Sequence, residues 1–273
     1  MDLSLKLFDN YGRRYPSEDD RLFSDKRSFY YKLKQPKIDY NLILERAKKY
    51  NLCSNELLVD DFESKANLLL SKLKKSDEFY PLTKGVHIPF IYNHSDKKID
   101  LGTSLEQTIL PALKDSFNEK FPQAHFKAVL QSNSERQGNI KVEPDSRYDS
   151  FLDASLDGAV GWYFPQAFQE FDIKSQRSQM KNLSEVEGLK MCLSGGMDIG
   201  ASVVGCPELL ISKDHYSPIL CMSAFVHSDE RLILVLKSYG PHMEFWCMTQ
   251  MLSKHTTQVS EQWSGGLTVF DEL

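Results

Sequence analysis

The sequence lacks the features that mark several common protein classes. Its five cysteines form no C-x-x-C pair, and an odd number argues against a disulfide framework. No apolar run approaches the ~18 residues that a transmembrane helix requires. The first residues also lack the basic region and apolar run of a cleaved signal. We therefore expect reduced cysteines in a cytoplasmic protein that has no membrane partner.

The charge balance argues against nucleic acid as a partner. The chain carries 33 Lys+Arg against 38 Asp+Glu, a net charge of −5. Proteins that hold nucleic acid by neutralising phosphates usually carry a basic surplus, so no nucleic-acid partner is expected. A protein or a small molecule is the expected partner. The sequence contains no internal repeat and no low-complexity segment.

The segment from Gly188 to Leu252 is poor in charge and holds four of the five cysteines, which is typical of a buried core. Three apolar runs in it are separated by short polar turns, and this pattern predicts an antiparallel three-strand meander. The runs are Pro218 to Val226, Leu232 to Tyr239 and Met243 to Met251. The middle run is apolar on both faces, which predicts a central strand covered on both sides.

Two helices are predicted in the N-terminal part of the chain, over residues 38–76. Asp39 is a suitable cap for the first helix and Ser54 for the second. Helical spacing of apolar residues predicts a buried stripe on each helix, so the two should form a helical hairpin. Lys72 is expected on the solvent face of the second helix. The aromatic residues of segment 1–36 predict an irregular arm that packs on the rest of the protein.

The middle of the chain mixes strand and helix patterns. A capping box at Thr103 and Glu106 predicts a helix that Pro111 kinks. Strands are predicted at residues 85–92, 124–130, 140–142 and 159–164, the second and third as a hairpin, and a polar helix follows at 166–181. The whole pattern predicts an α+β fold: a mainly antiparallel sheet with a C-terminal three-strand meander, packed with helices and an N-terminal helical hairpin.

Two arrangements into domains fit this pattern. The first has an N-terminal arm and helical hairpin at residues 1–80 and an α+β core domain at 81–273. In the second, the two parts form one continuous domain. The acidic, turn-rich stretch at 144–157 is a further, weaker boundary.

One short motif suggests a ligand. Ser194-Gly195-Gly196-Met197-Asp198 resembles the phosphate-binding loop of the ATP pyrophosphatases. That resemblance implies backbone N–H groups at a helix N-terminus that hold pyrophosphate. It is confined to this turn, and Ile199 stands where that family has a hydroxyl residue. The alternative is that the glycines serve to turn the backbone. No G-x-x-x-x-G-K-[ST] motif is present, which excludes a transporter-type ATPase.

Cysteine chemistry is a second candidate. Cys192 precedes the glycine turn, and a thiol nucleophile needs a histidine base and an acid to orient it. The candidate bases lie at turns between predicted strands: His215, His227 and His242. The candidate acids are Asp214 and Asp229. The alternative is that Cys192, Cys206, Cys221 and Cys247 are small core residues and that the histidines are turn residues.

Other ligand sites are less defined. The same histidines lack the H-x-H or H-x-x-x-H spacing that would place two zinc ligands together, so neither a metal nor another cofactor is expected. Aromatic residues such as Trp246 and Trp263 could form a ligand wall or could simply be packing. The function expected first is therefore a binding or regulatory protein. The alternatives are a thiol-dependent hydrolase or transferase, and a small-molecule or nucleotide binder at the Ser194-Gly195-Gly196 turn.

Overall fold

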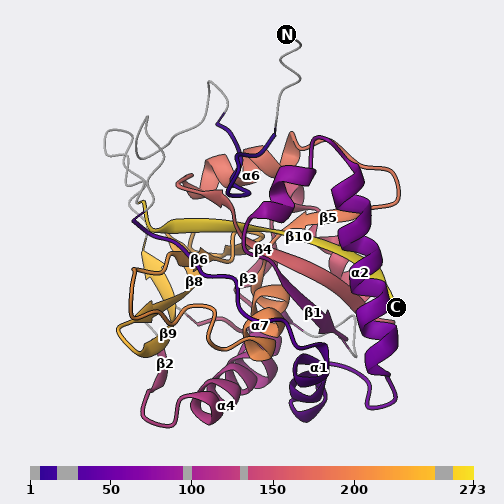
Figure 1. Ribbon diagram of the computed structural model, residues 1–273. Coiled ribbons are helices and arrows are strands. Elements are labelled where there is room, and N and C mark those ends of the chain that lie inside the picture. Colours follow the sequence, from indigo (N-terminus) through magenta and orange to yellow (C-terminus); the bar gives the residue numbers. More distant parts are fainter. Residues whose placement is uncertain (1–6, 17–29, 95–99, 130–134, 250–260) are drawn as a thin grey trace.

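The strand β10 (Trp263–Glu272) runs through the middle of the molecule, and the other elements are arranged around it (Figure 1). The computed structural model describes residues 7–16, 30–94, 100–129, 135–249 and 261–273. Within these residues, eight strands form one sheet in the order β1-β4-β10-β6-β8-β9-β2, with β5 also paired to β10. The strands besides β10 are β1 (Ile88–Tyr92), β2 (Phe126–Val129), β4 (Ala159–Gln169), β5 (Lys190–Leu193), β6 (Ile219–Cys221), β8 (Leu232–Tyr239) and β9 (His242–Thr249).

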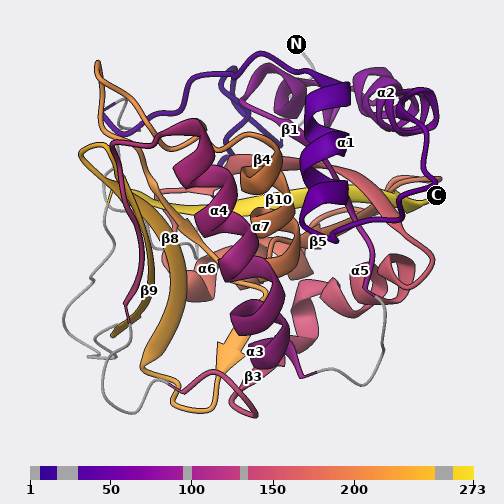
Figure 2. The same ribbon diagram turned by 90° about the horizontal axis from the view of Figure 1, so that it is seen from below.

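A separate pair of strands and several helices complete the fold. The strands β3 (Ile140–Val142) and β7 (Phe225–His227) form an antiparallel pair. The helices are α1 (Tyr40–Lys49), α2 (Val59–Lys75), α3 (Leu101–Ser104), α4 (Leu110–Lys120), α5 (Tyr148–Ser155), α6 (Ile173–Lys181) and α7 (Gly196–Gly205). Seen from below, α1, α4 and α7 lie together beneath the sheet (Figure 2). This architecture confirms the predicted α+β class with its mainly antiparallel sheet.

The predicted C-terminal meander is confirmed, with its first strand shorter than expected. The strands β6, β8 and β9 are antiparallel neighbours. Leu234 and Leu236 of β8 belong to the main hydrophobic core, whereas Ile233 and Val235 join a smaller cluster with Ile173 of α6. Both faces of β8 are therefore covered, as its sequence predicts. The first apolar run divides after β6, because Phe225 to His227 pair with β3 instead. Met251, the predicted end of the third run, lies outside the described residues.

The sheet divides on one side of β10. Along one edge, β10 pairs with β4. Along the other edge, its first residues pair in parallel with β6 and its later residues pair antiparallel with β5. Gly266 lies at the change of partner, where a Cβ would come within 2.3 Å of the Tyr163 ring and 2.7 Å of the Ser194 hydroxyl. A side chain is thus excluded here by the close packing of strands β4 and β5. We call this region the sheet fork.

The N-terminal helical hairpin is also confirmed, with two corrections. Asp39 caps α1 by accepting a hydrogen bond from the N–H of Leu42 at 3.0 Å. Ser54 does not cap α2, which begins after Leu58, because its hydroxyl bonds the nearby N–H of Glu56 instead. Lys72 is half-buried and donates to the carbonyl of Gly188 at 2.8 Å, so it is less exposed than predicted.

Three predictions for the middle of the chain are wrong in detail. The strands β2 and β3 do not form a hairpin: β2 pairs in parallel with β9, and β3 pairs with β7. The strand β4 extends to Gln169, and nearly all of its residues are buried. The predicted polar helix therefore starts only at Ile173. The helix predicted at Thr103 starts earlier, because Asp100 provides the cap.

Pro111 is accommodated by a change of helix type rather than by the predicted kink alone. A proline ring inside a helix collides with the carbonyl four residues earlier. In this protein, a wider π-helical turn spans Leu105–Ile109, just before Pro111. Such turns are uncommon and recur at functional sites.

The N-terminal part and the sheet share a core. One hydrophobic cluster contains Ile43 of α1, Phe62 of α2 and Leu234 of β8. The division of the chain at residue 80 remains a prediction. Of the predicted arm, residues 1–6 and 17–29 lie outside the described residues. Of the described helices, none combines the length and the apolar character needed to cross a membrane.

Candidate functional site

The Ser194-Gly195-Gly196 turn and Asp198 lie at the sheet fork, where β5 ends and α7 begins. Asp198 is fully buried and accepts three hydrogen bonds at its carboxylate. The donors are the N–H of Gly195 at 2.9 Å, the hydroxyl of Tyr148 at 2.8 Å and the hydroxyl of Thr268. Ser194 shares a 2.8 Å hydrogen bond with the same Thr268 hydroxyl. The turn therefore ties α5, α7 and β10 together through one carboxylate.

The electrostatics of Asp198 reflect a balance between burial and hydrogen bonding. Burial removes the carboxylate from water and raises its pKa to about 6, although the bonds from Thr268, Tyr148 and Gly195 lower it. Burial also raises the pKa of the Tyr148 hydroxyl well above its usual value. A group with a pKa near neutrality could serve as an acid or a base, but that role needs access to a substrate.

Packing around the turn leaves no room for a side chain at Gly195 or Gly196. A Cβ at Gly195 would lie 2.7 Å from the Tyr148 ring, and one at Gly196 would lie 2.6 Å from Leu105. The carboxylate of Asp198 already occupies the N-terminus of α7, where an anion would bind. The glycines thus let α7 approach its neighbours closely, and the polar atoms of the turn hold the helix on the sheet.

The cysteines of the C-terminal segment lie in the core. Cys192, Cys206, Cys221 and Cys247 are all buried, and none of them forms a disulfide within the described residues. Burial raises the pKa of Cys206 and Cys221 to about 12 and that of Cys192 well above the usual thiol value. The nearby Asp198 raises the pKa of Cys192 further. At neutral pH these thiols are protonated, and the thiolate is the reactive form.

The candidate histidines are spread over three elements. His227 uses both ring nitrogens: Nδ1 accepts from the N–H of Asp229 at 2.9 Å, and Nε2 donates to the carbonyl of Glu135 at 2.9 Å. His242 accepts from the N–H of His125 at 3.0 Å, and His215 bonds the hydroxyl of Ser212 at 2.9 Å. His215 is thus held by its own loop, whereas His227 and His242 also bond segments that are distant in the chain.

Of the two candidate acids, Asp229 is engaged locally. The side-chain hydrogen bonds of Arg231, helped by its backbone N–H, lower the pKa of Asp229 to about 2. Asp214 is exposed beside His215. Within the described ranges, no three His, Cys, Asp or Glu side chains come together as a metal site would require.

Trp246 and Trp263 come together on the far face of the sheet from the main core. Trp263 is nearly buried in the small cluster with Ile173, and Trp246 packs against that cluster. The indole N–H of Trp246 donates to Glu244 at 2.7 Å, and the ammonium of Lys237 lies 4.1 Å from the centre of its ring. Both tryptophans act mainly as packing residues, although Lys237 and Met248 beside them line a groove.

That groove lies beside two of the predicted residues, Asp214 and His215. It has a volume of about 570 Å³ and lies between the 212–217 loop and the turn that joins β8 to β9. Its lining residues are Tyr31, residues 212–217, Ile219, residues 237–240, Met248 and Gln262. Three tyrosines are exposed at or beside it: Tyr30 at 57%, Tyr216 at 60% and Tyr239 at 71%. We call it the tyrosine groove. Of the predicted site residues, it brings Asp214 and His215 together.

The tyrosines of the groove are arranged as a stacked group. The rings of Tyr30 and Tyr216 are stacked with their centres 5.0 Å apart, and Tyr31 meets Tyr30 edge-on at 5.2 Å. The backbone adds support, because the N–H of Lys32 donates to the carbonyl of Tyr216 at 3.0 Å. Comparison of the chain with known protein families, curated proteins and solved structures gives no match. The function must therefore be inferred from sites such as this one.

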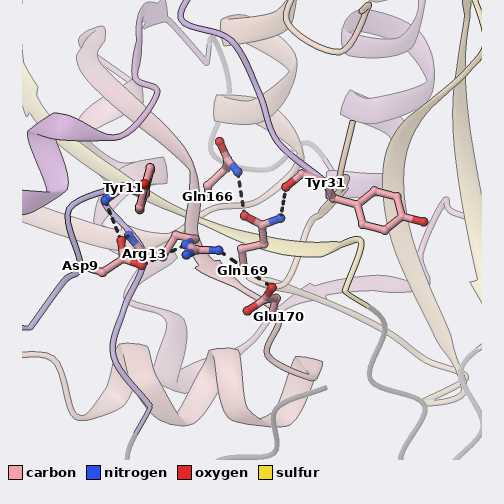
Figure 3. Close-up of polar contacts among 7 residues, drawn as sticks. All are labelled: Asp9, Tyr11, Arg13, Tyr31, Gln166, Gln169 and Glu170. Carbon is pink, nitrogen blue, oxygen red and sulfur yellow. Dashed lines mark hydrogen bonds and ion pairs between the residues drawn. The ribbon is translucent and has the colours of Figure 1, made fainter. Parts of the chain in front are cut away.

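A buried polar network holds Tyr31 at the edge of the groove (Figure 3). The side-chain amide of Gln169 donates to the Tyr31 carbonyl at 2.8 Å and accepts from Gln166 at 2.7 Å. Figure 3 shows the Tyr31 ring pointing away from this network. The carbonyl of Tyr31 is thus fixed by the end of β4, while its ring is left to line the groove.

Charged residues continue the network on the N-terminal arm. The buried guanidinium of Arg13 donates to Asp9 at 3.0 Å and lies 3.9 Å from the carboxylate of Glu170. Glu170 has a left-handed backbone, with φ of 72°. Such conformations are costly for residues other than glycine and persist where surrounding contacts hold them. The network fastens arm residues 9–13 to the end of β4.

The tyrosine groove leaves no motif in the sequence. The pair Tyr30 and Tyr31 lies far in the chain from Tyr216 and Tyr239, and the groove exists only because the fold brings these segments together. One local signal was present. Residues 30–37 combine two tyrosines with Lys32, Lys34 and Lys37, and so many lysines are unusual for a buried strand.

Proposed function

We propose that this chain is a non-enzymatic binding protein whose tyrosine groove receives an acidic segment of another protein. The observation that carries the proposal is the exposure of Tyr30, Tyr216 and Tyr239 around one groove. Tyrosine is enriched in protein interfaces because it buries a large area with little loss of conformational freedom. Soluble proteins rarely gather several exposed aromatic rings in one place without a partner.

The charge around the groove favours an acidic partner. Exposed Lys32, Lys34 and Lys37 lie on the segment that borders it, and exposed Lys213 lines it. A neighbouring hollow of about 400 Å³ shares the 212–215 stretch with the groove and is lined by Lys34 and Lys37. This concentration of lysines stands out in a chain of net charge −5. Partial burial and Lys32 also lower the pKa of His215, consistent with a positive local potential.

The core cysteines support a binding function over thiol catalysis. A thiol nucleophile needs access to its substrate and a lowered pKa. Cys192, Cys206 and Cys221 have neither, because burial raises the pKa of each thiol. The overall negative charge also favours a protein partner over nucleic acid, since phosphate binding relies on a positive surplus.

The proposal can be tested by selecting peptides from a randomised library displayed on phage. The selected peptides should be enriched in Asp and Glu, and their affinity should fall as salt is raised, because exposed charges are screened. Fluorescence anisotropy of labelled peptides should show binding at least tenfold weaker for the double variant Tyr216→Ala/Tyr239→Ala.

Tyr80→Ala is the matched control, because Tyr80 is 46% exposed but does not line the groove. It should bind the selected peptides as the unmodified protein does. Selection of peptides with no acidic enrichment, or equal binding by the double variant, would rule the proposal out.

A further inference from the structure

A second cavity, separate from the tyrosine groove, lies where the ends of α1 and β1 meet the π-helical turn. It has a volume of about 390 Å³. Its walls include residues 49–51 of α1 and its end, residues 92–94 of β1 and its end, and Ser104, Gln107, Thr108 and Asp115. We call it the π-turn cavity. It shares no lining residue with the tyrosine groove.

One buried side chain in its wall lacks a hydrogen-bond partner among the described residues. Ser104 is 4% exposed, and its hydroxyl makes no hydrogen bond within the described part of the chain. Buried hydroxyls are nearly always bonded in folded proteins, and each exception calls for an explanation. Because Ser104 lines a cavity, a bound molecule can supply the missing partner.

The backbone beside Ser104 is itself unusual. The π-helical turn Leu105–Ile109 follows it directly, and this turn places Gln107 and Thr108 in the wall. π-Helical turns occur often at ligand sites, where they aim side chains that a regular helix would point elsewhere. Pro111, which the turn accommodates, also lines the cavity. The local backbone and the unpaired hydroxyl thus point independently to the same place.

The opposite wall is a fixed polar surface. The hydroxyl of Tyr92 bonds Nδ1 of His94 at 3.3 Å, and both side chains are buried. Burial raises the pKa of Tyr92, so its hydroxyl stays neutral. Asn51 and Asn93 add amide groups at the ends of α1 and β1. A ligand would meet groups already held in place, which limits the entropy lost on binding.

The chemistry of the walls selects the class of ligand. Amide and hydroxyl groups dominate, and together they offer both donors and acceptors. The cation of the cavity, Lys49, is already paired with Glu119 at 2.7 Å, and Asp115 disfavours anions. We propose that the π-turn cavity binds an uncharged, hydroxyl-rich small molecule of the sugar or polyol class. Sugar hydroxyls also both donate and accept, so they match these walls better than a phosphate or a carboxylate does.

The first experiment uses saturation-transfer NMR on the full chain. The probes are glucose, galactose, mannose, myo-inositol and glycerol, with inorganic phosphate as the charged comparison. At least one uncharged probe should receive saturation and be displaced by its own unlabelled excess. Binding of phosphate alone, or of no probe, would overturn the proposal.

Substitutions in the cavity wall test whether the probe binds there. Ser104→Ala should weaken the affinity for the bound probe at least tenfold, measured by titration, while the unfolding midpoint of the unliganded protein stays the same or rises. The second result is expected because the change removes an unpaired buried hydroxyl. Asp115→Asn, at an exposed position, should also weaken binding without affecting the fold.

Ser71→Ala is the control, because Ser71 lies on α2 and bonds the carbonyl of Leu68 away from the cavity. It should bind the probe normally. Unchanged affinity in both Ser104→Ala and Asp115→Asn would show that the probe binds elsewhere, and the π-turn cavity would not be its site. Peptide binding at the tyrosine groove should be the same in all three variants, so failure of one proposal leaves the other intact.

Discussion

The hydroxyl of Tyr148 joins two elements at the sheet fork by donating to Asp198 at 2.8 Å and accepting from the N–H of Met197 at 3.2 Å. Tyr148→Phe removes both bonds and leaves the buried carboxylate with one donor fewer. Hydrogen bonds to charged groups contribute about 1.5–3 kcal/mol, so the free energy of unfolding should fall by about that amount. Urea unfolding monitored by circular dichroism measures the loss. A fall of less than about 0.5 kcal/mol would mean that this bond does not hold α5 to α7.

Asp198 makes stability depend on pH in a defined window. Its pKa of about 6 in the folded protein lies above its ordinary value of 3.8. The folded state therefore holds this proton more tightly than the unfolded state does. The stability from this group is fully present below about pH 4 and is lost as the pH rises through 6, by about 3 kcal/mol in total.

The matched variant is Asp198→Asn, which keeps the shape and removes the titration. The difference in unfolding free energy between the two proteins should change between pH 4 and 7 and be flat above. The lowered pKa of Asp229 makes the free energy of unfolding change with pH in the opposite direction, at lower pH. Because both proteins contain Asp229, this contribution cancels in the difference between them. A difference that does not vary with pH would contradict a raised pKa for Asp198.

Burial of the core thiols predicts slow chemical modification. Iodoacetamide at neutral pH should label Cys192, Cys206, Cys221 and Cys247 slowly in the folded protein, because all four thiols are buried and burial raises the pKa of the first three. Peptide mass spectrometry identifies the labelled sites. Cys53, which is half-buried with its pKa raised to about 11, should also react slowly. In urea all of these thiols should react. Rapid labelling of Cys192 in the folded state would contradict this prediction and would support Cys192 as a catalytic nucleophile.

The sequence predicts best those elements whose pattern follows from local spacing. Asp39 starts α1 as expected, and the doubly apolar run of β8 becomes a central strand. These predictions succeed because burial on one or both faces leaves a periodic record in the chain. Ser54 does not cap α2, because its hydroxyl accepts from the N–H of Glu56 instead. A serine hydroxyl can bond several nearby backbone groups, and sequence spacing alone does not show which one it bonds.

Strand partners and sites were harder to predict, because they depend on contacts between distant residues. The strand β2 lies close in sequence to β3 but pairs with β9. The glycine turn points to Asp198 in the sequence, yet its donors Tyr148 and Thr268 come from two other segments that no local motif connects to it. The tyrosine groove and the π-turn cavity likewise form only when separate segments meet. A single sequence records which residues are buried more clearly than which residues touch.

Leu234 should be among the most costly positions to truncate. Its side chain is 3% exposed in the main core, and the neighbouring Ile233 and Val235 are buried on the other face of β8. Little room exists for the strand to move into a cavity left on one side. Leu234→Ala should therefore lower the free energy of unfolding by about 2–5 kcal/mol, a large share of the 5–15 kcal/mol of a typical domain.

The control for Leu234→Ala is Lys74→Ala; Lys72 on the same helix is less suitable because it is half-buried and bonded to Gly188. Lys74 is exposed on α2, and its truncation should change stability by no more than about 0.5 kcal/mol. Urea melts of the two variants, fitted with a common slope, compare the losses directly. If Leu234→Ala unfolds at the same urea concentration as the unmodified protein, β8 is not covered on both faces in solution. The arrangement of β6, β8 and β9 between the two hydrophobic clusters would then be wrong.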